Sequence, residues 1–322
     1  MKLLEYLKMN LKKPKFWDYD KPNLLSNILF PFSKIFELIS KIKNKKSEKF
    51  SDIKSICVGN IYLGGTGKTT LSIELKKILD HENIKSCFIK KNHKNQFDEI
   101  RLLKKFGKIF IEKDRIKALN NAISEKYQVA IFDDGLQDKG ILYDLSFVCF
   151  NQKNMVGNSR LIPAGPLREN LDSLKKNKNI FIIGNNTNNT VFKNLLSKNS
   201  SNLEFFDCTY EPLNLTNFNR GTNYIAFSGI GNHETFVEML KENKFIISKH
   251  LEYPDHYSYS LSDIHEINQI AKSYDATIIT TKKDFLRIED KYQKNIEYID
   301  VGLKIRQIEK LKQKLKFIYE NN

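Results

Sequence analysis

The sequence has few cysteines and no long uncharged apolar run, and both shortages narrow what the protein can be. Its four cysteines (Cys57, Cys87, Cys149 and Cys208) are far apart and form no C-x-x-C pair. Three of them lie in apolar, strand-like stretches, which predicts buried reduced thiols in a cytosolic protein. No uncharged stretch approaches the roughly 18–20 residues of a transmembrane helix. There is no small-residue cleavage site of the secretory kind either, so a signal peptide is not expected.

Acidic residues are also in the minority, and the resulting charge suggests the kind of partner. The 322 residues carry 53 Lys and Arg against 38 Asp and Glu, a net charge of +15. A basic chain favours anionic partners: nucleic acid, an acidic membrane surface or phosphorylated substrates. Lysine is frequent throughout, so part of the charge is a general feature of composition. With 40% hydrophobic and 28% charged residues, the chain is typical of a globular protein with one large or two medium domains.

The N-terminal region predicts an amphipathic helix from Leu24 to Ile42. Its apolar residues recur at helical spacing, with serine, asparagine and charged residues between them. Lysines follow at positions 41, 43, 45 and 46. An apolar face with a basic tail suits the interface of an anionic bilayer. The pattern equally fits a helix that packs on the protein's own core, with a break at Pro31.

From Ser51 onward, short apolar runs alternate with helical patterns, which predicts a mostly parallel sheet with helices on both faces. A second α/β series follows, with a domain boundary between Asp207 and Asn223. The expected domains are residues 1–46 (amphipathic helix region), 47–212 (nucleotide-binding) and 213–322 (smaller α/β). The candidate strands are Ile56–Val58, Cys87–Ile89, Ile109–Ile111, Val129–Phe132, Phe147–Phe150, Ile180–Ile183, Leu203–Asp207, Tyr224–Phe227, Phe245–Ile247, Thr277–Ile279 and Tyr298–Val301. The candidate helices are Thr69–Leu79, Asp114–Lys126 and His233–Asn243, and a surface loop is expected over Gly184–Thr190.

The stretch V-G-N-I-Y-L-G-G-T-G-K-T-T (Val58–Thr70) has most of a phosphate-binding loop. The usual pattern, G-x-x-x-x-G-K-[ST], places Tyr62 where the first glycine is expected. A short strand precedes the stretch and an amphipathic helix follows it, which is the setting that such a loop requires. Glycines let backbone N–H groups converge on phosphate oxygens, while Lys68 reaches the phosphates and the Thr69 hydroxyl ligates Mg²⁺. The predicted ATP-binding residues are Tyr62, Leu63, Gly64, Gly65, Thr66, Gly67, Lys68 and Thr69.

A second stretch, V-A-I-F-D-D-G-L-Q, is an apolar strand that ends in Asp133 and Asp134. Carboxylates at the C-terminal end of a strand face the crevice where α/β sheets bind ligands. On its own, Asp-Asp-Gly also fits a simple turn. Beside a phosphate loop, it predicts the carboxylates that organise the metal of an ATP–Mg²⁺ complex, but it does not identify the phosphate acceptor.

The acceptor is suggested by a resemblance. The motifs G-G-T-G-K-T-T, D-D-G-L-Q and R-L-I-P-A-G-P-L-R-E (Arg160–Glu169) together resemble the tetraacyldisaccharide 4′-kinases, the lipid A 4′-kinases of Gram-negative bacteria. In that family the first loop position is also not glycine. Further similar motifs, in the family's order, are F-W (Phe16–Trp17), F-D-E (Phe97–Glu99), Y-P-D-H-Y (Tyr253–Tyr257) and T-K-K-D (Thr281–Asp284).

The resemblance implies a P-loop NTPase-like α/β fold and a reaction. Members transfer the γ-phosphate of ATP to the 4′-hydroxyl of a tetraacylated glucosamine disaccharide 1-phosphate. It implies Asp98 as the general base, His256 as its orienting partner and Lys68 as the phosphate clamp. The metal would then lie among Thr69, Asp133, Asp134 and Glu169, and Gln137 and Arg168 would hold phosphate or nucleotide. The second domain, which carries His256, would close on the first to bring the base and its partner together.

The resemblance also favours the membrane interpretation of the N-terminal helix, because members of the family carry a membrane-associated helix there. It implies a peripheral or monotopic monomer on the cytoplasmic face of the inner membrane. The partners would be the lipid substrate and an anionic membrane surface, with no nucleic acid.

This chain departs from the family pattern in three places. K-K-N-H-K-N-Q (Lys90–Gln96) replaces R-G-Y-G, Phe97 replaces a glycine, and Asp138 replaces a histidine. Two other classes of protein remain open. A P-loop regulatory or partitioning ATPase would act on a protein or nucleic acid, and a degenerate homologue would bind membranes without catalysis. His93 and His233 are expected to be a surface-loop residue and a helix cap.

Overall fold

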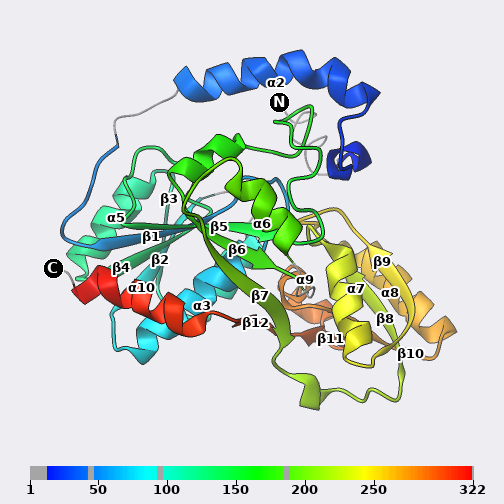
Figure 1. Ribbon diagram of the computed structural model, residues 1–322. Coiled ribbons are helices and arrows are strands. Elements are labelled where there is room, and N and C mark those ends of the chain that lie inside the picture. The colour runs from blue at the N-terminus through cyan, green and yellow to red at the C-terminus, as the bar shows by residue number, and fades with distance from the viewer. Residues whose placement is uncertain (1–12, 43–46, 93–96, 185–188, 321–322) are drawn as a thin grey trace. The chain divides into compact units, whose positions relative to one another are not determined.

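The computed structural model describes residues 13–42, 47–92, 97–184 and 189–320 (Figure 1). These residues fall into two compact units. The larger unit comprises residues 13–92, 103–209 and 303–320 of the described chain, and the smaller unit comprises 97–102 and 210–302. The chain passes from one unit to the other within α4 (Phe97–Lys104), β7 (Glu204–Pro212) and β12 (Val301–Ile305).

The larger unit is built on an eight-stranded sheet in the order β12-β7-β6-β5-β1-β4-β2-β3. The six ladders from β7 to β3 are all parallel. Parallel strands buried on both faces carry near-continuous apolar runs, as these do. Besides β7 and β12, the strands are β1 (Lys54–Gly59), β2 (Ser86–Lys91), β3 (Ile109–Glu112), β4 (Val129–Asp133), β5 (Leu145–Asn151) and β6 (Asn179–Ile183).

Helices cover both faces of this sheet (Figure 1). On one face, α5 (Arg115–Ser124) and α6 (Thr190–Ser197) bury apolar side chains among alternate residues of the strands. On the other face, α3 (Lys68–His81) packs against β1, β2 and β4. The C-terminal helix α10 (Ile308–Glu320) buries Leu311 and Leu315. The predicted doubly covered parallel sheet is therefore confirmed.

The smaller unit has a four-stranded parallel sheet in the order β11-β10-β8-β9. Its strands are β8 (Asn223–Ser228), β9 (Ile246–Glu252), β10 (Ala276–Thr281) and β11 (Ile296–Ile299). Alternate residues of β8 face opposite cores: Ile225 and Phe227 pack with α8 (Leu261–Ser273), whereas Tyr224 and Ala226 pack with α7 (His233–Glu242). A short helix, α9 (Lys282–Phe285), follows β10 directly.

Every predicted strand is present, although several differ in extent; β7, predicted as Leu203–Asp207, continues to Pro212. The predicted strand Tyr298–Val301 is divided at Asp300 into β11 and β12, because the residues after it pair in the larger sheet. Strand β9 begins one residue later than predicted and continues through exposed residues to Glu252. An edge strand with polar side chains lacks the apolar pattern from which strands are predicted. His93 and most of the Gly184–Thr190 loop lie outside the described residues.

The segments that make up each unit differ from the segments that were predicted for each domain. The C-terminal segment, expected in the smaller domain, belongs to the larger unit, because β12 extends its sheet and Lys314 pairs with Glu204 at 2.9 Å. The segment with Asp98, expected in the nucleotide-binding domain, belongs to the smaller unit. Residues 13–42, expected to be separate, group with the larger unit.

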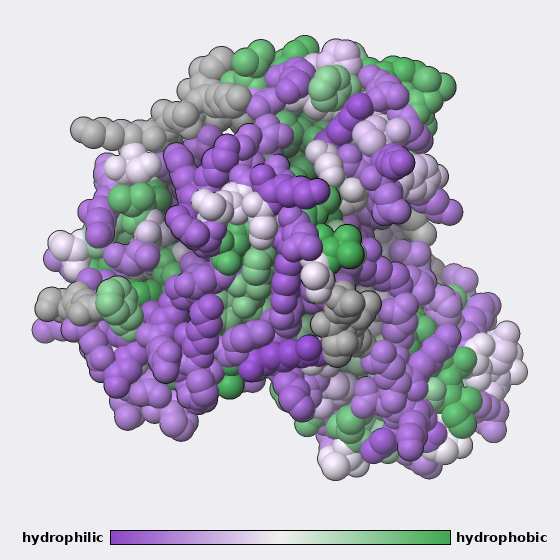
Figure 2. Space-filling view, in the orientation of Figure 1, coloured by the Kyte–Doolittle hydropathy of each residue, from purple (hydrophilic) through white to green (hydrophobic). Residues whose placement is uncertain are grey.

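Helix α2 spans Leu24–Ile42, as predicted, and packs on the larger unit through polar side chains. Ser26 and Ser33 are buried, and their hydroxyls donate to the carbonyls of Ala164 (2.6 Å) and Leu161 (2.8 Å). The apolar residues on the other side are exposed: Leu24, Leu25, Ile28, Phe32, Ile35, Leu38 and Ile39 each have 48–74% of their surface accessible. A surface helix ordinarily turns its apolar stripe toward the core. The alternative in which this stripe packs on the protein's own core is therefore wrong for the described residues, and Figure 2 shows apolar surface along α2.

None of the helices among the described residues has the length and apolar character that crossing a bilayer would require.

All four cysteines are buried and free, as predicted. Burial raises the pKa of the Cys87 and Cys149 thiols to about 12, so both stay protonated and unreactive at neutral pH.

Candidate functional site

The predicted phosphate loop follows the central strand of the larger sheet. Strand β1 lies between β4 and β5, so that β5, β6 and β7 extend the sheet on one side of β1 and β4, β2 and β3 extend it on the other. In open parallel sheets, ligands bind beyond the carboxyl ends of the strands at this kind of switch point. The register pairs Val58 with Asp133, so that the loop and the Asp-Asp stretch leave the sheet side by side.

Two glycines give the loop its shape. Gly64 has φ +135° and Gly67 has φ +76°, backbone conformations that other residues rarely adopt. Gly67 is the N-cap of α3, so Lys68 and Thr69 are the first residues of that helix. Inside the curve, the amide of Asn60 donates to the Thr66 hydroxyl at 2.8 Å and to the carbonyl of Tyr62 at 2.6 Å. The N-terminus of α3 and the loop's backbone N–H groups are therefore set up to receive an anion.

Tyr62, at the position of the missing glycine, fixes the loop to the larger unit through its ring and its hydroxyl. Its ring is buried in the core cluster of the larger unit. Its hydroxyl donates to the Asp18 carboxylate and accepts hydrogen bonds from Lys13 (2.7 Å) and Asn154 (2.9 Å). A large side chain is tolerated here because it points into the core, and Gly64 and Gly67 supply the turn.

Asp133 is fully buried and lies among hydroxyl and ammonium groups. Its carboxylate accepts hydrogen bonds from Thr69 and Ser72, each at 3.3 Å. The ammonium group of Lys90 lies 2.6 Å from its Oδ2, and the side chain of Lys90 is 1% exposed. A buried charge needs a partner of opposite sign, and this pair supplies one for each residue.

Asp134 connects the loop to the Arg160–Glu169 segment. It has φ +59°, a left-handed conformation that is uncommon outside glycine and is often found at functional sites. Its carboxylate lies 3.7 Å from the Lys68 ammonium and 3.0 Å from the Arg168 guanidinium. Arg168 also donates to Gln137 at 3.1 Å.

The Arg160–Glu169 segment pairs with the phosphate loop through its backbone. The Leu63 N–H donates to the Pro166 carbonyl at 2.8 Å, and the Arg168 N–H donates to the Ile61 carbonyl at 2.7 Å. Glu169, predicted near the metal, has its pKa raised by burial, which a hydrogen bond with Gln137 partly offsets.

Asp98 and His256, predicted as base and partner, lie together in the smaller unit. The Asp98 side chain, on the first turn of α4, is 2% exposed, and its Oδ1 lies 3.3 Å from Nδ1 of His256. His256 has φ +59°, and its N–H donates to the Gly229 carbonyl at 3.0 Å. Since both residues belong to one unit, the prediction that domain closure brings them together is wrong: the contact exists within the smaller unit.

Arg287 completes this cluster. Its guanidinium lies 2.7 Å from Oδ2 of Asp98 and 2.9 Å from Oδ1 of Asp284, which is fully buried. It also donates to the Gly229 carbonyl at 2.5 Å. The guanidinium thereby ties α4, the end of β8 and α9 together around the predicted base.

The surroundings of the two predicted catalytic groups shift their pKa values in opposite directions. Burial alone would raise the pKa of Asp98, but the His256 hydrogen bond and the charges of Arg287 and Lys283 hold it well below the usual range. Burial alone would lower the pKa of His256, but its contact with Asp98 and the nearby carboxylates raise it. The pair therefore favours a carboxylate next to a protonated imidazole.

Three residues of the site have no counterpart in the sequence predictions: Asn60, Lys90 and Arg287. An asparagine immediately after a strand and before a glycine-rich loop is a weak signal that the loop is braced. Lys90 ends a run of buried strand residues, and a lysine there indicates a buried acidic partner. Arg287 follows the T-K-K-D motif by three residues and carries no signal of its own.

We predict that Arg287→Met lowers the stability of the smaller unit. The substitution removes the guanidinium that contacts both buried carboxylates, Asp98 and Asp284, a loss of about 3–5 kcal/mol. Hydrogen-exchange mass spectrometry of peptides from β8 and β10 would measure it. Lys291→Met is the matched control, because the Lys291–Glu289 pair in the same unit is exposed and its loss should leave exchange unchanged.

The same prediction has a pH dependence. Because the folded pKa of Asp98 lies below its unfolded value of about 3.9, its contribution is present above that pH and is lost as pH falls through the folded pKa. The difference between wild type and Arg287→Met should therefore stay constant from neutral pH to about pH 5 and shrink below about pH 4. A difference that grows on acidification would contradict the assignment.

Comparison with known proteins places the chain in a family. The family model described as tetraacyldisaccharide-1-P 4′-kinase (LpxK) matches residues 25–319. A protein from Pelagibacter ubique (strain HTCC1062), named tetraacyldisaccharide 4′-kinase, is 52% identical over 98% of this chain and 100% of its own length. A protein of the same name from Rickettsia canadensis (strain McKiel) is 32% identical over 95% of this chain and 97% of its own.

A solved structure supports the fold independently. LpxK from Aquifex aeolicus in complex with ATP superposes with a TM-score of 0.67 at 23% identity, covering 92% of this chain and 100% of that one. At this identity the likeness concerns the fold alone. The match to the family model and the identity to the two relatives show that this chain belongs to the tetraacyldisaccharide 4′-kinase family.

Proposed function

We propose that this chain is an ATP-dependent kinase that phosphorylates the 4′-hydroxyl of tetraacyldisaccharide 1-phosphate, forming lipid IVA in lipid A biosynthesis. The observation that carries the proposal is the phosphate loop beside Asp133 and Asp134 in a chain that belongs to this kinase family. The regulatory-ATPase alternative leaves both the Arg160–Glu169 segment and the Asp98 cluster without a role.

The larger unit holds the nucleotide. Phosphoryl transfer depends mainly on positioning and on neutralising charge at the phosphates. The curved backbone of the loop, the N-terminus of α3 and the Lys68 ammonium bind the phosphate oxygens. Arg168, fixed by Asp134 and Gln137, adds a second cation on the same side of the sheet.

The residues around Asp133 fit a magnesium ion. Mg²⁺ prefers hard oxygen donors and is held by one or two carboxylates together with substrate phosphates. The Thr69 hydroxyl and the Asp133 carboxylate offer such donors side by side, and Lys90 offsets part of the carboxylate's charge. We propose Thr69 and Asp133 as ligands, with Asp134 and Glu169 around them. The bound ion supplies positive charge that stabilises the phosphates.

The smaller unit supplies the base. Asp98 accepts the proton of the 4′-hydroxyl, and His256 orients the carboxylate. A carboxylate with a lowered pKa is a weak base. That suffices for a loose phosphoryl-transfer transition state, in which the attacking hydroxyl loses its proton late. Arg287 keeps Asp98 ionised and in place.

Helix α2 suits a membrane-bound substrate. Four acyl chains cannot leave a bilayer at low cost, since each exposed CH₂ costs about 0.8 kcal/mol. The enzyme must therefore work at the bilayer, and α2 presents a row of exposed Leu, Ile and Phe side chains. We propose that α2 lies in the interface of the cytoplasmic face of the inner membrane and that the net charge of +15 favours its anionic lipids. We further propose that a monomer is the active form and that nucleic acid is not a partner.

The first functional prediction concerns the phosphate clamp. Lys68→Ala should abolish transfer of radiolabelled phosphate from ATP to tetraacyldisaccharide 1-phosphate in detergent micelles, because the charge on the phosphates loses its stabilisation. Circular dichroism should be unchanged. Lys77→Ala is the control, since Lys77 is a half-exposed residue of the same helix whose ammonium contacts Glu74 and the ring of Phe106. Near-normal activity of Lys68→Ala would overturn the loop assignment.

The second functional prediction tests whether Asp98 and His256 act as one unit. Asp98→Asn and His256→Gln should each lower kcat by about 10²–10⁴-fold, with little change in the KM for ATP. The double variant should be scarcely slower than Asp98→Asn, because groups that act together are not additive. Multiplied losses would mean that the two residues act independently.

The third functional prediction concerns α2. The double variant Ile28→Asn/Ile35→Asn should sediment less with anionic vesicles and lose activity on bilayer substrate, while its melting temperature stays unchanged because both side chains are exposed. Val191→Asn, an exposed apolar residue on α6 of the same unit, is the control. Equal sedimentation of the double variant and wild type would place the membrane contact elsewhere.

A further inference from the structure

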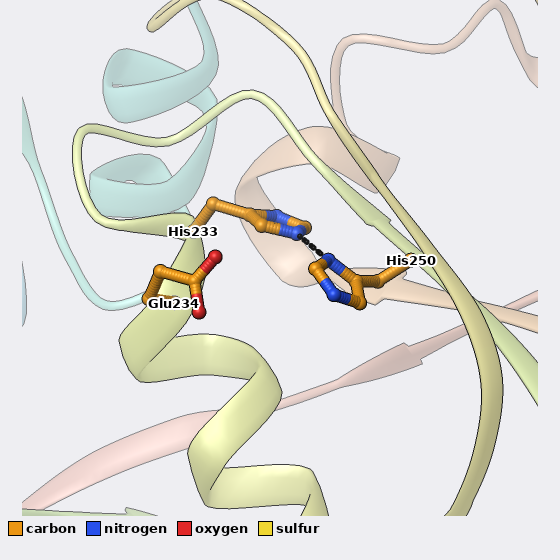
Figure 3. A group of neighbouring side chains, drawn as sticks. All are labelled: His233, Glu234 and His250. Carbon is orange, nitrogen blue, oxygen red and sulfur yellow. Dashed lines mark hydrogen bonds between the residues drawn. The ribbon is translucent and has the colours of Figure 1, made fainter.

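A cluster of two imidazoles and a carboxylate lies in the smaller unit and has no role in the proposed reaction. His233 and Glu234 are the first two residues of α7, and His250 is on the neighbouring strand β9 (Figure 3). One potential ligand atom from each residue lies within 4.8 Å of the others. The sequence prediction of His233 as a helix cap is wrong: Asn232 is the N-cap, and His233 is 2% exposed.

The inner histidine is held as metal-binding histidines are. Nδ1 of His233 lies 2.8 Å from the buried Ser228 hydroxyl. A hydrogen bond from one ring nitrogen to a neighbouring group fixes the tautomer and leaves the other nitrogen with its lone pair. When Nδ1 donates to Ser228, the lone pair of Nε2 points toward His250, whose Nδ1 is 2.9 Å away.

The spacing of these nitrogens suits a shared ion. Two nitrogens 2.9 Å apart, each about 2.0–2.1 Å from a metal, subtend about 90° at it. That is the angle between adjacent ligands in octahedral or five-coordinate geometry. His250 and Glu234 are exposed, so their side chains can change rotamer to reach the ion, and water can occupy its remaining coordination positions. The positive end of α7 opposes a cation there, and the Glu234 carboxylate in the same turn offsets it.

We propose that His233, Glu234 and His250 form a binding site for one divalent transition-metal ion of the kind that imidazole prefers, Zn²⁺ or Ni²⁺. Imidazole ligands favour these ions, whereas Mg²⁺ prefers oxygen donors. On binding, the proton of His250 moves from Nδ1 to Nε2, so both rings stay neutral and each offers a lone pair. The ion joins the start of α7 to β9.

The site lies next to the backbone that holds the predicted catalytic histidine. Ser228, the partner of His233, precedes Gly229, whose carbonyl accepts hydrogen bonds from His256 and Arg287. An ion bound to His233 therefore stabilises the connection between β8 and α7, which contains Ser228 and Gly229. The proposal concerns binding and does not depend on the kinase reaction.

Isothermal titration calorimetry on tag-free, chelator-treated full-length protein tests the site. Wild type should bind one Zn²⁺ or Ni²⁺ per chain in the presence of millimolar Mg²⁺, and binding should raise the melting temperature. His250→Gln and Glu234→Gln should fold normally, because both side chains are exposed. His250→Gln should weaken binding by at least about tenfold. Glu234→Gln should weaken it less.

His265→Gln is the matched control, because His265 is an exposed histidine on α8 of the same unit and lies outside the cluster. It should bind as wild type does. A Co²⁺ complex of the wild type should show visible d–d absorption that His250→Gln lacks. Failure of wild type to bind Zn²⁺ and Ni²⁺, or equal binding by His250→Gln, would overturn the proposal.

Discussion

The segment Arg160–Glu169 has no helix or strand ladder of its own and pairs only some of its backbone groups internally, and the partners that the other groups find elsewhere organise the larger unit. Buried N–H and C=O groups are costly when unpaired. The Leu161, Pro163 and Ala164 carbonyls accept hydrogen bonds from Ser33, from the Trp17 indole and from Ser26, which fixes residues 17–33 on the unit. Further along, the backbone at positions 166 and 168 pairs with the phosphate loop. Motifs that are far apart in the sequence are thus parts of one hydrogen-bonded arrangement.

The parts of the fold that were predictable are those whose signal is local. The apolar runs of the central strands and the Gly-Lys-Thr turn after β1 each carry their information within a few residues. The helical repeat of α2 gave its limits, Leu24–Ile42, because period and charge change at both ends. Periodicity does not say which face of the helix contacts the rest of the protein. In α2 that face is the one with Ser26 and Ser33, because their hydroxyls contact backbone carbonyls of the larger unit.

What was missed depends on contacts between distant residues. Lys90 and Asp133 are 43 positions apart, and Asp98 and Arg287 are 189 apart, so no window of sequence joins them. The same reason explains why the predicted domains differ from the two units. The prediction placed one boundary between two continuous domains, whereas the chain passes from one unit to the other within α4 and again within β12. Asp98 therefore belongs with His256, although the Lys68 loop and Asp133 lie nearer to it in sequence.

Helix α2 is attached to the larger unit through its polar side, which leaves its apolar side exposed. Had it packed through its apolar stripe, burial would have fixed it firmly, and no apolar surface would remain for a bilayer. Serine hydroxyls on backbone carbonyls contribute only about 0.5–1.5 kcal/mol each, but they attach the helix through its polar side. The exposed Leu, Ile and Phe residues lose favourable burial in water and regain it in lipid, at about 25 cal/mol per Å². The proposed membrane binding and the folding of this helix would therefore use opposite faces and would not compete, which is what an enzyme acting on a four-chain lipid requires.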